Sequence, residues 1–142
     1  MCKINLQQTD YSLLPEARLE DKRRIDTTEL KNIFQQYCEY KRFKSVQPLF
    51  DSEFLSEETD VITYSYRCRT IAFSILRRYT DEDIEAVQFA WDYSSPGLRL
   101  GIRSLEHECA FYKRLGYKNL YLGQSAPYKQ RFDGYETLGP LC

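Results

Sequence analysis

The chain has 142 residues, and its 20 Lys and Arg against 21 Asp and Glu give a formal net charge of -1. This length is typical of one domain, 1–142, with a single core, and the balanced charge excludes a long electrostatic footprint on a nucleic acid. The five cysteines, at positions 2, 38, 68, 109 and 142, form no C-x-x-C pair. That spacing argues against a metal site and favours a reducing cytoplasm, and no signal peptide or membrane span is evident.

The N-terminal part is expected to hold one clear helix. Lys3 to Gln7 is a weak strand candidate, and the charged segment from Pro15 to Asp26 is predicted to be a loop or a frayed helix. Apolar residues then recur at three- and four-residue spacing, which predicts an amphipathic helix from Thr28 to about Lys41. A shorter helical turn is predicted within the segment 48–58.

A period of two begins at Val61 and predicts three antiparallel strands. The first two meet at a turn near Arg67 to Arg69, and a turn at Asp81 to Asp83 leads into a third strand, Ile84 to Tyr93. Strict alternation along the third strand places Val87, Phe89, Trp91 and Tyr93 on one face and Ala86, Gln88, Ala90 and Asp92 on the other. The second face alternates small and polar residues, which is typical either of a half-exposed strand or of a strand that borders a ligand.

The strongest helix is predicted from Leu98 to Leu115, where apolar residues step by four and three positions and Gly116 provides a stop. The segment "YKNLYLGQ", 117–124, is then expected to be a buried strand, parallel to the preceding one through a right-handed crossover. The fold class is therefore predicted to be α/β with a mixed sheet.

The start of this helix is a candidate anion site. Gly97 and Gly101 flank a helix N-terminus, where unpaired N–H groups attract phosphate or an oxyanion. Arg99 and Arg103 lie about one turn apart and suit a phosphate or a carboxylate, although these residues taken alone favour a solvated helix face with an ion pair between Arg103 and Glu106. His107, the only histidine in the chain, is expected to be a surface or packing residue, because no metal co-ligand lies near it in sequence.

The order of helices and strands resembles the GNAT acyltransferase superfamily. Members that use acyl-CoA carry a Q/R-x-x-G-x-G/A loop at the start of the long helix, where this chain has Leu98-x-x-Gly101-x-Arg103. The stretch "WDYSSPGLRLGIRSLEHECAFYKRLGYKNLYLG" is more closely similar to the C-terminal region of arginyl-tRNA–protein transferases. The matching positions are Asp92-Tyr93, Arg99-Leu100-Gly101, Ser104, Glu108, Leu115-Gly116-Tyr117, Tyr121-Leu122-Gly123, Tyr128-Lys129, Phe132, Glu136 and Leu138.

This resemblance implies transfer of an amino acid from the acceptor end of an aminoacyl-tRNA to an amine of a protein or peptide. Asp92 is then the expected proton acceptor or amine anchor, and Gln88 is expected to orient the substrate. The expected substrate-binding residues are Trp91, Tyr93, Arg99, Gly101, Arg103, Ser104, Tyr121, Gln124, Tyr128 and Lys129. Within this set, the arginines are assigned to phosphates of the tRNA 3′ end, and Tyr93 or Tyr121 to the terminal base.

No metal and no cofactor are expected for this reaction. Two alternatives stay open at this stage: a GNAT N-acetyltransferase that uses acetyl-CoA, and a non-catalytic GNAT-like interaction module. Exposed edge strands favour a homodimer in each case.

Overall fold

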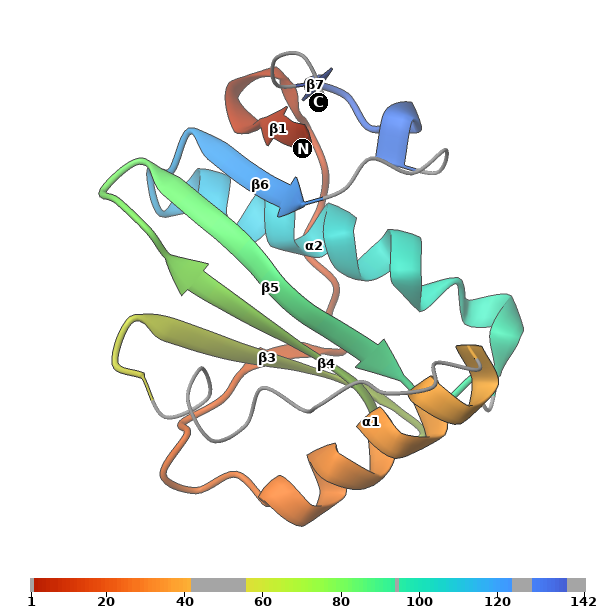
Figure 1. The fold of residues 1–142 in the computed structure, drawn as a ribbon. Helices are drawn as coiled ribbons and strands as arrows, with labels where there is room; N and C mark the ends of the chain where they lie inside the picture. Colours follow the sequence, from red (N-terminus) through yellow and green to blue (C-terminus); the bar gives the residue numbers. More distant parts are fainter. Residues whose placement is uncertain (1, 42–55, 94, 124–128, 138–142) are drawn as a thin grey trace.

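The computed structural model describes residues 2–41, 56–93, 95–123 and 129–137. Within these residues it contains a mixed sheet of order β2-β3-β4-β5-β6-β1-β7, two helices and three short 3-10 turns (Figure 1). The strands are β1 Cys2–Asn5, β2 Ala17–Leu19, β3 Thr59–Tyr66, β4 Arg69–Arg78, β5 Asp83–Trp91, β6 Asn119–Gly123 and β7 Tyr135–Thr137. The helices are α1 Thr27–Lys41 and α2 Leu100–Arg114, and the turns are η1 Leu6–Gln8, η2 Pro96–Leu98 and η3 Lys129–Arg131.

The two helices cover opposite faces of the sheet. α1 packs its buried residues Leu30, Ile33 and Phe34 against one face, where Phe73 and Ile75 of β4 lie. α2 packs on the other face, in a larger cluster that joins β1, β3, β4, β5 and β6. Burying an aliphatic or aromatic side chain of this kind contributes roughly 1.5–3 kcal/mol, so both faces stabilise the sheet.

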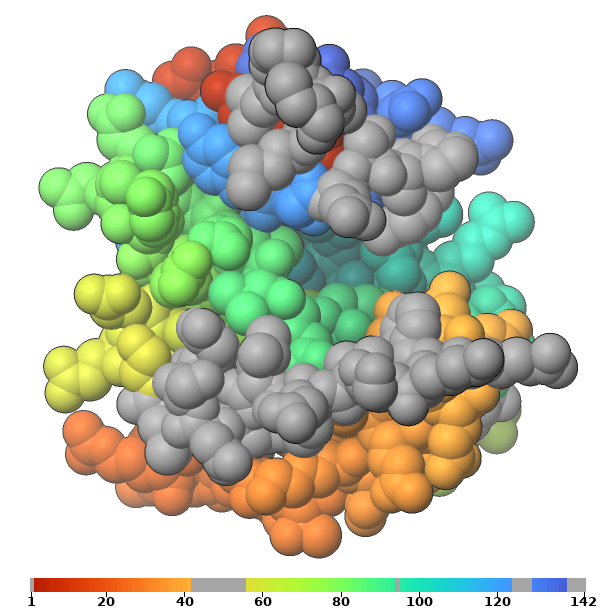
Figure 2. Space-filling model, in the orientation of Figure 1, coloured from red at the N-terminus to blue at the C-terminus, as the bar shows by residue number. Residues whose placement is uncertain are grey.

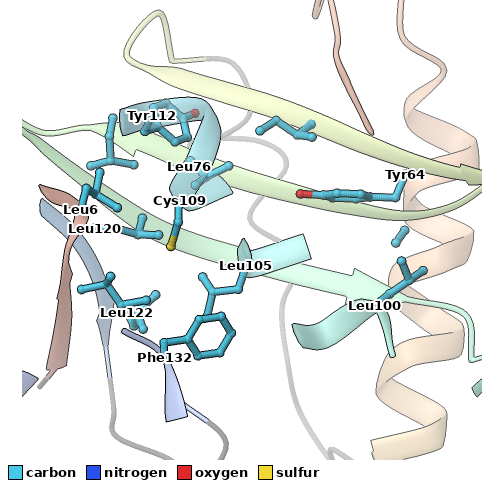
Figure 3. Packing of buried hydrophobic residues seen from close by; sticks show 14 of the residues in the cluster. Leu6, Tyr64, Leu76, Leu100, Leu105, Cys109, Tyr112, Leu120, Leu122 and Phe132 are labelled. Carbon is cyan, nitrogen blue, oxygen red and sulfur yellow. The ribbon is translucent and has the colours of Figure 1, made fainter. Parts of the chain in front are cut away.

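The core on the α2 face is shown in Figure 3, where Leu105, Cys109 and Tyr112 point from the helix toward the sheet. These three residues recur at positions four and three apart, which is the spacing that predicts the buried stripe of an amphipathic helix. On the sheet side, Leu76 of β4 and Leu120 of β6, both fully buried, belong to the same packed cluster.

The mixed α/β architecture that the sequence predicts is confirmed, with α1, the β3–β4–β5 meander, α2 and a parallel β6 in the expected order. The prediction of a loop or frayed helix across Pro15 to Asp26 is wrong in part, because Ala17–Leu19 forms β2 and pairs with β3. A short edge strand is made by its partner and not by its own hydrophobic pattern. Most of the helical turn predicted within 48–58 lies outside the described residues.

A bulge in β5 changes which side chains share a face. Ile75 pairs with Gln88 and Leu76 pairs with Ala86, so Val87 is an extra residue opposite the β4 ladder. The expected alternation is therefore wrong across this point: Val87 packs on the α1 face, whereas Phe89 packs on the α2 face. The bulge makes the residues beyond it lie on the faces opposite to those that strict alternation assigns.

β5 and β6 pair only at one end. Their parallel pairing runs from Asp83↔Asn119 to Glu85↔Tyr121, although β5 continues to Trp91 and β6 to Gly123. Beyond these pairs the two strands diverge, and α2, which connects them, passes along the opening (Figure 1). No helix in the described part of the chain is both long enough and apolar enough to cross a membrane.

Candidate functional site

A pocket of about 230 Å³ opens where β5 and β6 diverge. It is called the splay pocket below, and its lining residues are Tyr37, Ala86, Val87, Gln88, Phe89, Gly101, Ser104, Leu105, Glu108, Leu122 and Lys129. These residues come from α1, β5, α2, β6 and η3, so both faces of the sheet contribute. In Figure 2 the surface is hollowed between β6 above and α1 below, with atoms of α2 behind.

One face of α2 forms the wall of this pocket. Gly101, Ser104, Leu105 and Glu108 line it, and their positions i, i+3, i+4 and i+7 lie on a single side of a helix. A Cβ atom added to Gly101 would meet no atom within 4 Å, so the wall is open at the start of the helix. The small residues leave room above Glu108, which lies two turns further along α2.

Glu108 is a buried carboxyl group in this wall, with 4% of the residue exposed. Its Oε2 atom accepts hydrogen bonds from the Tyr64 hydroxyl at 2.5 Å and from Ser74 Oγ at 2.7 Å. Burial raises the pKa of Glu108 from 4.5 to about 7, and the two hydrogen bonds lower it only in part. A carboxyl group with a pKa near neutral pH is well matched to general acid–base work.

Gln88 provides a second polar group. Its Oε1 atom is buried and has no hydrogen-bond partner among the described residues, and the side chain lines the splay pocket. Buried polar atoms in folded proteins almost always have a partner, which is protein, water or ligand. The structure therefore holds a buried acceptor beside the pocket, and its donor is not among the described residues.

Lys129 brings a positive charge to the rim of the pocket. Its Nζ atom donates to the carbonyl oxygen of Leu122 at 3.1 Å, which ties η3 to the end of β6. The splay pocket thus combines a carboxyl group, an amide oxygen and an ammonium group on an otherwise apolar and small-residue lining.

Four of the site residues expected from the sequence line this pocket: Gln88, Gly101, Ser104 and Lys129. Gln124 and Tyr128 lie outside the described residues. The remaining six, Trp91, Asp92, Tyr93, Arg99, Arg103 and Tyr121, are not among the pocket's lining residues.

Asp92 and Arg103 each lie in an ion pair away from the pocket lining. The Asp92 carboxylate is 7% exposed, and one of its oxygens lies 3.1 Å from Arg69 Nη2. Arg103 Nη2 lies 3.6 Å from Glu16 Oε1, and both residues border a different cavity beneath Leu98. The structure thus directs both side chains toward protein partners.

The aromatic candidates lie beside the splay pocket. Tyr93 stacks on Tyr40 with ring centroids 3.9 Å apart, and its ring is also 4.3 Å from that of the largely buried Trp91. Tyr121 borders a second cleft of about 460 Å³ with Arg77 and Tyr79, and Ala86 lines both that cleft and the splay pocket.

The start of α2 uses several of its own N–H groups internally. The Leu98 N–H donates to the Ser95 carbonyl at 3.0 Å and the Arg99 N–H to the Pro96 carbonyl at 3.2 Å. The N–H groups of Ile102 and Arg103 both donate to the Arg99 carbonyl. Arg99 adopts φ +51°, in the left-handed region, and this conformation turns the chain from η2 into the helix. Fewer N–H groups are left for an anion than an open glycine loop provides.

His107 has a packing role, as the sequence predicts. Its Nδ1 atom accepts a hydrogen bond from the Leu14 N–H at 3.0 Å, and its ring lies against Tyr64 and Phe111. Burial lowers the pKa of the imidazole. The described residues contain no group of three or more His, Cys, Asp or Glu that could hold a metal ion.

Sequence reasoning overlooked Glu108 as a site residue. The available signal was its position, three residues after Leu105 and four before Tyr112, both of which lie on the buried stripe of α2. A carboxyl group on the buried face of a helix needs partners or a shifted pKa, and Glu108 has both.

Comparisons with known proteins identify the fold. No family model matches the chain, and neither does any curated protein, but solved structures do. One is the C-terminal domain of a protein assigned as a lysylphosphatidylglycerol synthetase from Agrobacterium fabrum, with a TM-score of 0.64 and 10% identity over 87% of this chain and 46% of that one. Another is a GCN5-related N-acetyltransferase from Kribbella flavida, with a TM-score of 0.59 and 11% identity over 95% of this chain and 52% of that one. The chain has the GNAT fold.

A third GNAT-fold structure, a GNAT family acetyltransferase from Staphylococcus aureus, has a TM-score of 0.55 and 15% identity over 89% of this chain and 96% of that one. The chain spans less than half of the Agrobacterium fabrum chain, at 46%. At these identities the likeness shows the fold alone, and the splay pocket must be interpreted from its own residues.

Proposed function

We propose that this chain transfers an acyl group to an amine in the splay pocket, and that the donor is an aminoacyl-tRNA and the acceptor an amine of a protein or peptide. The observation that carries the proposal is the position of Glu108: a buried carboxyl group with a pKa of about 7, in the wall of the pocket where β5 and β6 diverge. Acyl transfer to an amine is accelerated by a group of this kind beside the reacting atoms.

The reaction balances without a further reactant. The amine nitrogen attacks the carbonyl carbon of the ester that joins the amino acid to the tRNA 3′ end, so a C–N bond forms and the C–O bond to the ribose breaks. The amine gives up one proton and the leaving ribose oxygen takes one up. Glu108 accepts the first proton and returns it to the ribose oxygen, which leaves the carboxyl group unchanged after each turnover.

Gln88 and Lys129 have complementary roles in this proposal. The Gln88 amide oxygen accepts an N–H of the incoming amine, which supplies the donor that this buried atom lacks among the described residues. The Lys129 ammonium stabilises the negative charge that develops on the carbonyl oxygen. An α-amino group titrates near ~8, so Glu108 needs to remove a proton only from an amine that is already partly neutral at pH 7.

Two observations favour an aminoacyl donor. The sequence resemblance to arginyl-tRNA–protein transferases covers the end of β5, the start of α2 and β6, which are the elements around the splay pocket. The N–H groups of Leu98, Arg99 and Ile102 also donate to the carbonyls of Ser95, Pro96 and Arg99, so the turn that leads into α2 offers a reduced cradle for a pyrophosphate.

Acetyl-CoA is the second candidate donor. It is supported by the names of two matching structures, which are an N-acetyltransferase and an acetyltransferase of the same fold. The pocket chemistry would be the same, with a thioester in place of the ribose ester and a sulfur as the leaving atom.

A label-transfer assay tests the proposal. The chain is incubated with labelled aminoacyl-tRNAs or labelled acetyl-CoA and with peptides of varied N-terminal residue, and the label on the peptide is counted. We expect label to move from an aminoacyl-tRNA, and we expect Glu108→Gln to reduce the rate by 10²-fold or more, the usual contribution of a general base.

Glu106→Gln is the matched control, because Glu106 lies on the same helix but does not line the splay pocket. It should leave the rate unchanged. If acetyl-CoA alone donates, the aminoacyl form of the proposal is wrong, and if neither label moves, the chain is a non-catalytic module and the whole proposal fails.

A further inference from the structure

A stack of aromatic rings stands at the mouth of the splay pocket. Tyr93, two residues after the end of β5, packs on two rings of α1: Tyr40 stacks on it at 3.9 Å and 13°, and Tyr37 lies at 6.0 Å and 11°. Tyr37 also lines the splay pocket, so the stack leads from the pocket to the surface. The C-terminal end of α1, the end of β5 and the start of α2 come together here (Figure 1).

The outer ring of the stack is open to solvent. Tyr40 is 59% exposed, which is unusual for a large aromatic residue that already packs on another ring. Tyr93 adopts φ +56°, a conformation that non-glycine residues seldom adopt, so its surroundings hold the ring in place. The chain thus maintains an uncommon backbone geometry next to a ring that exposes much of its surface.

A lysine lies beside the stack. Lys41 Nζ lies 5.5 Å from the centroid of the Tyr93 ring, and Arg99, also exposed, immediately precedes α2. On the same turn of α1, Glu39 accepts a hydrogen bond from Gln35 Nε2 at 3.3 Å. A planar exposed ring with cations beside it is the usual platform for a nucleobase and its phosphates.

The splay pocket is small for a whole donor. Pockets that bury a whole drug-sized ligand span roughly 300–1,000 Å³. The splay pocket, at about 230 Å³, suits the reacting groups but leaves the nucleotide part of a donor outside.

We propose that Tyr40, supported by Tyr93, is the stacking platform for the adenine of the donor's nucleotide end, with Lys41 and Arg99 beside its phosphates. This inference rests on the proposed function. Two kinds of donor could supply the adenine. The terminal adenosine of tRNA and the adenosine of CoA both present an adenine ring with phosphate nearby.

Binding experiments on the whole chain separate these sources. The probes are the RNA trinucleotide CCA, CoA, and ribose 5-phosphate as a ligand without a base. Trp91 is the only tryptophan and lies 4.3 Å from the Tyr93 ring, so its fluorescence reports on the stack. Equilibrium dialysis of labelled probes gives the affinity independently.

We expect CCA to bind, Tyr40→Ala to weaken that binding by about tenfold or more, and Tyr40→Phe to retain it because the ring is kept. Ribose 5-phosphate should bind far more weakly than CCA. Tyr79→Ala is the matched control, since Tyr79 is 67% exposed and has the Arg77 guanidinium 5.9 Å from its ring centroid, but does not line the splay pocket. It should leave binding unchanged.

The platform is overturned if Tyr40→Ala binds CCA and CoA as tightly as the unmodified chain, if Tyr79→Ala loses as much affinity, or if ribose 5-phosphate binds as well as CCA. A loss confined to CoA supports the platform but contradicts the aminoacyl-tRNA donor. Because the label-transfer assay with Glu108→Gln does not involve Tyr40, failure of the platform and failure of the proposed reaction give different results.

Discussion

Burial and hydrogen bonding shift the pKa of the Glu108 carboxyl group in opposite directions. Its burial disfavours the charged form, while the Tyr64 and Ser74 hydroxyl groups donate to the same oxygen and favour it. The outcome is a pKa of about 7, so the group changes charge within the range in which proteins work. Neither surrounding hydroxyl group is itself a strong acid: burial raises the pKa of Tyr64 well above its ordinary value.

This pKa predicts how stability depends on pH. The folded state keeps its proton up to about pH 7, whereas the unfolded chain loses it near 4.5, so the contribution of Glu108 to stability falls as pH rises between these values. The loss amounts to about 3 kcal/mol across this window and is complete above it.

Urea unfolding of the unmodified chain and of Glu108→Gln checks this. Glutamine has no such titration, and every other group titrates alike in both proteins. The free energy of unfolding of the variant relative to the unmodified chain should therefore rise by about 3 kcal/mol from pH 4 to pH 8. A difference that stays constant over this range would show that Glu108 has an ordinary pKa.

Replacing Gln88 should raise the stability of the chain and lower its activity. Its buried Oε1 atom has no partner among the described residues, and such an atom costs the folded state about 1–3 kcal/mol. Gln88→Met removes the polar group at nearly constant volume, so the urea midpoint should rise while label transfer falls about tenfold. A methionine variant that is less stable and fully active would contradict the role given to this amide.

At the scale of elements, α2 connects the sequence pattern to the pocket. Its apolar spacing was sufficient to predict the helix, and the same spacing places Gly101, Ser104 and Glu108 together on the pocket side. Two features of the sheet could not be predicted from the sequence. β2 and β7 are three-residue strands that depend on their partners, and the bulge at Val87 leaves no mark on the alternation.

The candidate site was also predictable only in part, because contacts between residues distant in sequence decide where its side chains lie. Gln88, Gly101 and Ser104 line the pocket because β5 and α2, which carry them, lie close to where the sequence predicts a strand and a helix, whereas Lys129 lies on η3, which the sequence pattern does not predict. Asp92 and Arg103 were chosen for their charge, but their partners Arg69 and Glu16 are distant in sequence, and sequence spacing does not reveal them.

Gly101 gives the prediction for α2 itself. Gly101→Ala should stabilise the chain by about 0.5 kcal/mol, because alanine favours a helix and its Cβ meets no atom within 4 Å. The same methyl group occupies open space beside the pocket, so label transfer should fall. Gly97→Ala, whose Cβ is equally unobstructed but which does not line the pocket, should keep full activity. Equal rates for both variants would argue against a substrate at the start of α2.

For the whole molecule, the sheet separates two packed faces, and the splay pocket is the opening to which both contribute. Tyr37 reaches it from α1 and Glu108 from α2, and β5 and β6 form its sides. The aromatic stack lies at the same end, so the proposed donor platform and the proposed reacting groups fall on one side of the molecule.

The overall charge of -1 limits the electrostatic part of the proposed donor binding. A near-neutral chain with a few exposed cations near the stack should contact only about two or three phosphates. The affinity for an intact tRNA should then fall with salt with a log–log slope of about -2. A slope of about -6 or steeper, measured by filter binding between about 50 and 200 mM salt, would indicate a long nucleic-acid footprint instead.

The most direct measurement is the pH dependence of single-turnover acyl transfer, compared between the unmodified chain and Glu108→Gln with the same donor and the same peptide. Titration of the acceptor amine is common to both proteins, so the ratio of the two rates isolates Glu108. We predict that the rate of the unmodified chain divided by the rate of Glu108→Gln rises about tenfold per pH unit below pH 7. This ratio should level off above about pH 7, where the Glu108 carboxylate has formed. A ratio that is independent of pH would contradict the assignment of Glu108 as the base in the splay pocket.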